Sequence, residues 1–250
     1  MTAPVKEGVV GSGPAEETTP RPMSMNPSSL LPNPQAARFE APILRLTMTN
    51  ENDRLTFDLD RQGVQPFIPL LRSGFTWPFE RGRSLREILL EAGIPEEAIE
   101  SRLQTVFING SPVDSLDDPV FGPEARLALS AAMPGLFGAS MRRAGYYAGL
   151  RESISCLAAG RAGSSESGLQ GRLFIRLLNF TATEMGPYFL CRGVGLQAGQ
   201  LAELLSELPA GFWSACKTAR AGGVQIEAKP RALQEWLAGR SEVVLQVRGG

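Results

Sequence analysis

The sequence contains no histidine among its 250 residues. This absence excludes Ser-His and Cys-His nucleophilic machinery, acid–base catalysis by imidazole, and His-ligated zinc or iron sites. The three cysteines, Cys156, Cys191 and Cys216, are widely separated and form no Cys-x-x-Cys pair. The sequence therefore predicts neither a zinc ribbon nor a thioredoxin-type motif, and we expect free thiols. We expect no catalytic residues, no metal ligands and no cofactor.

Long apolar runs and an excess of one charge are also missing. No apolar run approaches the ~18 residues of a transmembrane helix, and the first ten residues lack the apolar core of a signal peptide. Lys and Arg total 25 against 26 Asp and Glu, which gives a net charge of -1. Such a balance offers no overall electrostatic reason to bind nucleic acid or an anionic membrane. We therefore expect a cytoplasmic protein without a membrane span or a nucleic-acid partner.

Two composition shifts divide the chain. Residues 1–38 hold seven of the 19 prolines and no aromatic residue, which predicts a disordered tail. Glycine and serine dominate the stretch Gly160–Gly168, which predicts a flexible linker. The sequence thus predicts a first module over 39–135, a connecting segment over 136–171, and a second module over 172–250.

The first module shows the element order β-β-α-β-β. Strands are predicted at 43–48, 55–59, 75–79, 105–108 and 126–131, the second by strict alternation of apolar and polar residues. Ser84 and Glu87 form a capping box that starts a helix, and Gly93 ends it. Asn109-Gly110 predicts a tight hairpin after the strand 105–108.

The second module is predicted to repeat that order. Its expected strands are 173–180, buried on both faces because it is nearly all apolar, then 188–191, 212–219, 224–226 and 243–247. Helices are expected around Leu201–Leu208 and from Pro230 to Leu237. The fold class is therefore α+β, with two modules that each combine a mixed sheet and one packed helix.

Several motifs invite a functional interpretation. Gly193, Gly195 and Gly199 occupy the place of a dinucleotide fingerprint, but the βαβ context is missing, which favours a glycine-rich turn between a strand and a helix. The acidic pairs and clusters are interpreted as solvated strand and turn residues rather than as a metal or acid–base site; they are Asp58, Asp60, Asp114, Asp117 and Asp118.

The segment Met133–Leu157 mixes glycine, apolar residues and arginines. This composition fits a docking segment for a partner or an anionic surface. It fits equally a segment that packs against one of the two modules. The sequence leaves both interpretations open.

The chain ends in Val-Arg-Gly-Gly directly after an apolar strand. Because glycine has no Cβ, Gly249 and Gly250 could thread a narrow enzyme channel and present the terminal carboxylate. Together with Lys229–Trp236 and Glu242–Arg248, this end resembles the C-terminal half of ThiS/MoaD sulfur carriers. The first module is also similar to that β-grasp family, in the segments Ser84–Leu89, Ile108–Val113 and Met133–Gly135.

The resemblance implies two ubiquitin-like β-grasp modules and a carrier role at Gly250, with Gly249 as its permissive neighbour. A partner adenylating enzyme would activate the terminal carboxylate with ATP, and a sulfur donor would convert it to a thiocarboxylate. The first module would be a scaffold or docking unit. The alternative is a non-catalytic binding module that uses a sheet face or the segment 133–157, with incidental terminal glycines.

Overall fold

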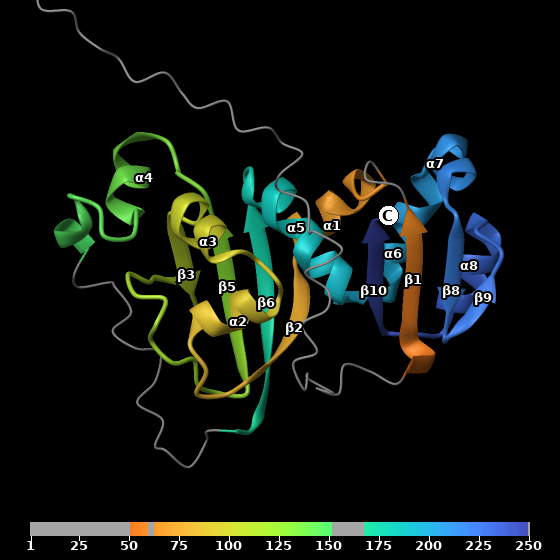
Figure 1. Cartoon of the computed structure of the whole chain (residues 1–250), viewed down its shortest axis with the longest axis horizontal. Helices are drawn as coiled ribbons and strands as arrows, with labels where there is room; N and C mark the ends of the chain where they lie inside the picture. Colours follow the sequence, from red (N-terminus) through yellow and green to blue (C-terminus); the bar gives the residue numbers. More distant parts are fainter. Residues whose placement is uncertain (1–50, 60–62, 152–167, 250) are drawn as a thin grey trace, which may run out of the picture. The chain divides into compact units, whose positions relative to one another are not determined.

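The computed structural model describes residues 51–59, 63–151 and 168–249, and Figure 1 shows their arrangement. The predicted tail 1–38, the predicted strand 43–48, the linker residues 160–167 and Gly250 lie outside the described residues. The described helices are α1 (Ile68–Ser73), α2 (Leu85–Glu91), α3 (Glu96–Arg102), α4 (Gly135–Met141), α5 (Thr181–Arg192), α6 (Ala198–Glu207), α7 (Ala210–Ala215) and α8 (Pro230–Leu237). Short 3-10 turns are η3 (Glu51–Asp53), η4 (Gln65–Phe67) and η5 (Ala148–Arg151).

Ten strands of the described residues form one mixed sheet in the order β4-β3-β5-β6-β2-β7-β10-β1-β8-β9. Their bounds are β1 Arg54–Leu59, β2 Phe75–Glu80, β3 Thr105–Ile108, β4 Ser111–Pro112, β5 Glu124–Ser130, β6 Gln170–Leu178, β7 Val194–Gln197, β8 Thr218–Ala221, β9 Val224–Ile226 and β10 Glu242–Gly249. The α+β class predicted from the sequence is therefore confirmed.

Strands cross the boundary between the two predicted modules. β1, from the first, pairs parallel with β10 and antiparallel with β8. β6, from the second, pairs parallel with β5 and antiparallel with β2. The two five-stranded groups meet where Thr76 on β2 lies opposite Gly195 on β7. Two β-grasp modules are therefore not confirmed, because each group of strands contains one strand from the other part of the chain.

The local signals in the first half are confirmed. Ser84 caps α2 through a complete capping box with Glu87. Asn109 and Gly110 adopt positive φ angles of 52° and 85° and join β3 to β4. The apolar faces of α2 and α3 belong to the same buried core as β5 and β6. Both helices therefore pack on one side of the sheet. The residues of β5 and β6 that alternate with the buried ones point to the other side.

Four expectations for the second half are wrong. Residues 188–191 belong to helix α5, and residues 212–215 belong to α7, so neither segment is a strand. Short apolar runs do not distinguish a buried strand from a buried helix, which explains both errors. The glycine motif consequently starts at Gly193, the C-cap of α5, continues through Gly195 in β7 and ends at Gly199 in α6, so it is not a turn between a strand and a helix. Finally, the strand β6 is buried on one face only, because Phe174 is 37% exposed.

Candidate functional site

Strand β6 has one buried face and one exposed face. Leu173, Ile175 and Leu177 are at most 1% exposed and face the core. The alternate residues, Arg172, Phe174 and Arg176, are exposed. Successive side chains of a strand point to opposite faces of the sheet, so these three lie in one row on the face away from the core.

The neighbouring strands extend this row into a surface. β5 shows the same alternation, with Ala125, Leu127 and Leu129 buried. Glu124 and Arg126, on either side of Ala125, are exposed. The parallel register places Arg126 beside Phe174, and the antiparallel register places Thr76 on its other side. We call this side of β3, β5, β6 and β2 the open face.

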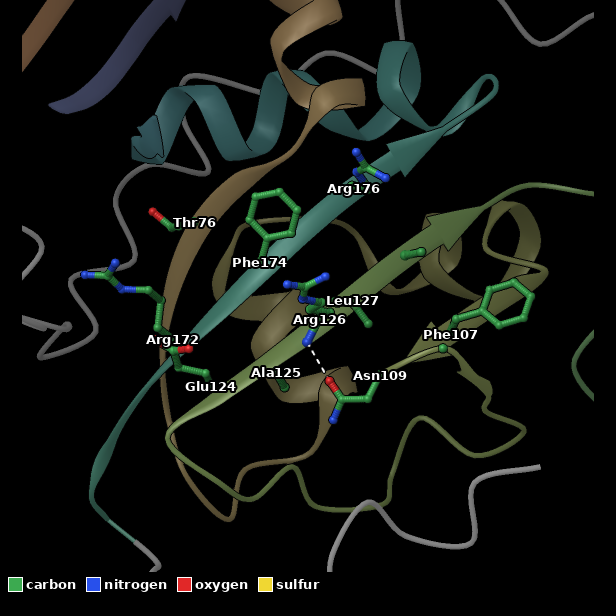
Figure 2. A pocket seen from close by; sticks show the side chains of 12 residues that line it. Thr76, Phe107, Asn109, Glu124, Ala125, Arg126, Leu127, Arg172, Phe174 and Arg176 are labelled. Carbon is green, nitrogen blue, oxygen red and sulfur yellow. Dashed lines mark hydrogen bonds between the residues drawn. The ribbon is translucent and has the colours of Figure 1, made fainter. Parts of the chain in front are cut away.

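The open face is hollowed into a pocket of about 850 Å³, seen from close by in Figure 2. Its charged side chains are three arginines, Arg126, Arg172 and Arg176, and one glutamate, Glu124. The pocket is further lined by Thr76, Phe107, Asn109, Gly110, Ala125, Leu127, Ala128 and Phe174. Local positive charge therefore collects beside aromatic rings, although the whole chain has a net charge of -1.

The three arginines are held in different ways. Arg172 Nη1 lies 3.2 Å from Glu242 Oε2, and Arg176 Nε donates a 3.0 Å hydrogen bond to the carbonyl of Ser73. The guanidinium of Arg126 makes no hydrogen bond or ion pair within residues 51–59, 63–151 and 168–249. Arg126 is thus the arginine of the open face with its full set of donors available.

The backbone around Arg126 is fixed by the β3–β4 hairpin. The amide of Arg126 donates to Asn109 Oδ1 at 2.8 Å, and the amide of Asn109 donates to the carbonyl of Arg126 at 2.8 Å. Figure 2 shows the first of these bonds as a dashed line. The side-chain oxygen of Asn109 is used in this way, which leaves its Nδ2 donors at the rim of the pocket.

Phe174 occupies a place that glycine makes available. A Cβ on Gly74, which has a φ of 122°, would lie 2.2 Å from Cζ of the Phe174 ring. Real Cβ atoms do not approach another atom so closely, so the ring packs directly against the Gly74 backbone. This contact orients the ring while it remains 37% exposed.

The residues that the sequence singled out at the C-terminus lie elsewhere. Strand β10 continues to Gly249, which pairs with Leu59, so it extends two residues beyond the end at residue 247 that the sequence predicts. Arg248 and Gly249 are nevertheless exposed, and a Cβ on Gly249 would meet nothing within 4 Å. Gly250 lies outside the described residues.

Three of the five acidic residues that the sequence singled out have structural partners, and Asp60 lies outside the described residues. Asp114 pairs with the buried Arg151 at 2.6 Å, Asp117 accepts a 2.6 Å hydrogen bond from Arg86, and Asp58 accepts one from Thr218. No group of three or more candidate ligands that could hold a metal occurs in the described part of the chain. Burial and Asp58 together raise the pKa of the Cys216 thiol, which disfavours the reactive thiolate.

The segment 133–157 is described as far as Arg151. Arg151 anchors it, because its guanidinium also donates to the carbonyls of Ser140 and Arg142 at 2.6 and 3.1 Å. These hydrogen bonds hold the described part of the segment at Arg151. Four large apolar side chains before it are exposed, namely Leu136, Phe137, Tyr146 and Tyr147.

The sequence interpretation missed the open face for one reason. The prediction of a strand buried on both sides rests on its high apolar content, whereas Arg172 and Arg176 alternate with the apolar residues Leu173, Ile175 and Leu177 in a one-sided pattern. That alternation is the signal that could have identified the surface.

No described helix is long and apolar enough to cross a membrane. No protein-family model matches the chain, and searches of curated proteins and of solved structures gave no match.

Proposed function

We propose that this chain is a non-catalytic binding protein that engages an anionic partner through the open face. The observation that carries this proposal is the position of Arg126, whose guanidinium has no partner in the described residues, directly beside the exposed ring of Phe174. Arg172 and Arg176 flank the ring along β6, so a bound anion would meet several donors.

The arrangement suits recognition better than catalysis. Guanidinium groups do not deprotonate in proteins, so arginines supply charge and directed donors but no general base. Among the described residues that line the pocket, Glu124 is the only carboxylate. A hollow with several cationic donors and aromatic surface therefore supports binding of an anion through charge-assisted hydrogen bonds.

A sulfated polysaccharide column tests this proposal with heparin as the probe. The wild-type protein should be retained at low salt, and Arg126→Glu should elute at a clearly lower salt concentration. Arg231→Glu is the matched control, because it makes the same charge change at a 91% exposed side chain on α8. Equal effects of the two substitutions, or no retention of the wild type, would show that the open face does not bind anions.

The second candidate is the ThiS/MoaD-like carrier role at Gly250. It is favoured by the exposure of Arg248 and Gly249 and by the open space around Gly249, which leave the end of β10 accessible to another protein. A partner enzyme would form an acyl-adenylate from the terminal carboxylate and ATP, releasing pyrophosphate. Sulfide supplied by a donor would then attack the acyl carbon and displace AMP to give the thiocarboxylate.

Mass spectrometry of the C-terminal peptide tests the carrier role. Cleavage after Glu242 yields residues 243–250, which contain no methionine, so oxidation cannot imitate the product. Protein from its native host should contain a fraction of this peptide about 16 Da heavier, because sulfur replaces oxygen. Deletion of Gly250 should abolish that fraction, and an invariably unmodified peptide in the presence of the host's activating enzymes would exclude this role.

A further inference from the structure

We propose that the open face binds single-stranded nucleic acid, with bases stacked on Phe174 and Phe107 and phosphates bound by the arginines. This inference rests on the proposed function and specifies the partner. Neither the exposed apolar residues between Leu136 and Tyr147 nor the glycine motif combines charge with a hollow as the open face does.

The two aromatic residues stand in positions that suit separate bases. Phe174 lies beside Arg126, and Phe107 on β3 lies opposite Ala128, which is two residues further along β5. With strands about 4.8 Å apart and about 3.3 Å per residue, the Cα atoms of the two residues are about 12 Å apart on the sheet. They are therefore too far apart to enclose one base and can each stack on a different one.

Arginines surround the Phe174 ring in the same plane of the sheet. Arg172 and Arg176 are two residues away on either side of it along β6, or about 7 Å, and Arg126 is its neighbour on β5. A planar guanidinium matches the geometry of a phosphate group and binds it through two parallel hydrogen bonds. Phosphates on either side of a stacked base would thus each meet an arginine.

The combination favours nucleic acid over an acidic peptide. A carboxylate-rich peptide would use the arginines but would leave the faces of two aromatic rings without a planar partner. Base–aromatic stacking combined with a basic surface is the general means of binding single strands without strong sequence preference. The Nδ2 donors of Asn109, which have no partner in the described part of the chain, lie at the same pocket and can donate to the acceptors of an exposed base.

A duplex fits this surface less well. Its bases are stacked on one another inside the helix and cannot present their faces to side chains of a sheet. The net charge of -1 for the whole chain provides little long-range steering, so the expected phosphate contacts are those of the arginines on the open face. Three contacting arginines predict a slope of about -2 for the logarithm of affinity against the logarithm of salt concentration.

Fluorescence anisotropy with a labelled oligouridylate of about a dozen nucleotides tests the inference on the full chain. Phe174→Leu keeps an apolar side chain against Gly74 but removes the stacking surface, and should weaken binding about tenfold. Phe174→Tyr should retain wild-type affinity. Arg126→Gln should weaken binding about tenfold and reduce the magnitude of the salt slope by about 0.7, the value for one phosphate on a single strand.

Controls separate this inference from the proposed function. Arg231→Gln should bind like the wild type, a duplex of matched length should bind more weakly, and a polyglutamate peptide should not compete. Melting curves of all variants establish that they are folded. If Phe174→Leu binds like the wild type, or polyglutamate competes equally, the nucleic-acid inference is overturned while heparin retention still supports the open face. If the wild type binds neither oligonucleotide nor heparin, both proposals fall.

Discussion

The hydroxyl of Thr76 on β2 donates a 2.6 Å hydrogen bond to Oε1 of Glu242 at the start of β10. The other carboxylate oxygen of Glu242 accepts a 3.2 Å hydrogen bond from Arg172 on β6. One carboxylate therefore joins strands from both five-stranded groups, at the place where Thr76 also lies opposite Gly195. These side-chain hydrogen bonds thus reinforce the junction of the two groups, where β2 and β7 pair through a single pair of residues.

Gly195→Ala should destabilise the protein by about 1 to 3 kcal/mol, the usual effect of adding a methyl group to a filled space. A Cβ at this position would lie 2.0 Å from Thr76 Oγ1 and 3.0 Å from Glu242 Oε1. The free energy of unfolding from urea denaturation measures the loss. Because Gly195 is buried, the added atom has no exit toward solvent.

Two further variants isolate the cause. Gly199→Ala is the matched control, since a Cβ there meets nothing within 4 Å, and it should not destabilise α6. Combining Gly195→Ala with Thr76→Ala removes the hydroxyl that obstructs the new methyl group, so this pair should cost less than the sum of the single changes. Strict additivity would contradict the proposed clash.

Ser84→Ala should lower the free energy of unfolding by about 1 kcal/mol, because the helix α2 loses its N-cap acceptor. The Ser84 hydroxyl accepts from the amide of Glu87 at 3.2 Å, and Glu87 Oε2 accepts from the amide of Ser84 at 2.8 Å. Thermal or urea denaturation measures the change. Ser101→Ala, in an exposed position of α3 that caps nothing, should have a much smaller effect.

Acid should weaken the ion network around Arg86. Hydrogen bonds from Arg86 lower the pKa of Asp117 and of Glu100. Because these pKa values are lower in the folded protein, the unfolded chain binds more protons in acid, and stability falls as the pH falls through the two pKa values. The stabilisation is fully present above the unfolded values, near pH 4 to 5.

Arg86→Gln should make this pH dependence shallower. Urea midpoints measured at intervals from about pH 6 to about pH 3 give the slope directly. Arg231→Gln removes an exposed i,i+4 pair on α8 and serves as the control, since such pairs are largely screened by solvent. A slope for Arg86→Gln as steep as that of the wild type would show that other carboxylates dominate acid unfolding.

Asp114→Ala should destabilise the chain by about 3 kcal/mol, because it leaves the guanidinium of Arg151 without its carboxylate. Arg151 is 2% exposed and binds both oxygens of Asp114, at 2.6 and 3.1 Å. Hydrogen exchange in α4 and η5 should accelerate more than in the sheet. Asp118→Ala removes the same charge nearby and should leave both measurements close to wild type.

Local sequence signals determined several elements of this protein. The capping box at Ser84 and Glu87 and the hairpin at Asn109-Gly110 depend on hydrogen bonds and φ angles within a few residues, so the sequence alone sufficed to predict them. The alternation of apolar and polar residues in β1 likewise sufficed to predict a strand. The apolar run at 188–191 did not suffice to predict a helix, because burial of α5 on several sides removes the periodicity that distinguishes a helix from a strand.

Only the tertiary structure decided which distant strands are neighbours. The pairing of β1 with β10 and of β6 with β5 joins segments far apart in the chain, and their register depends on which faces bury together in one core. The same pairing brings Arg126 beside Phe174 and gathers positive charge on one face of a chain whose total charge is -1. The net charge is the sum of all charges in the sequence, whereas binding depends on where those charges lie in the folded protein.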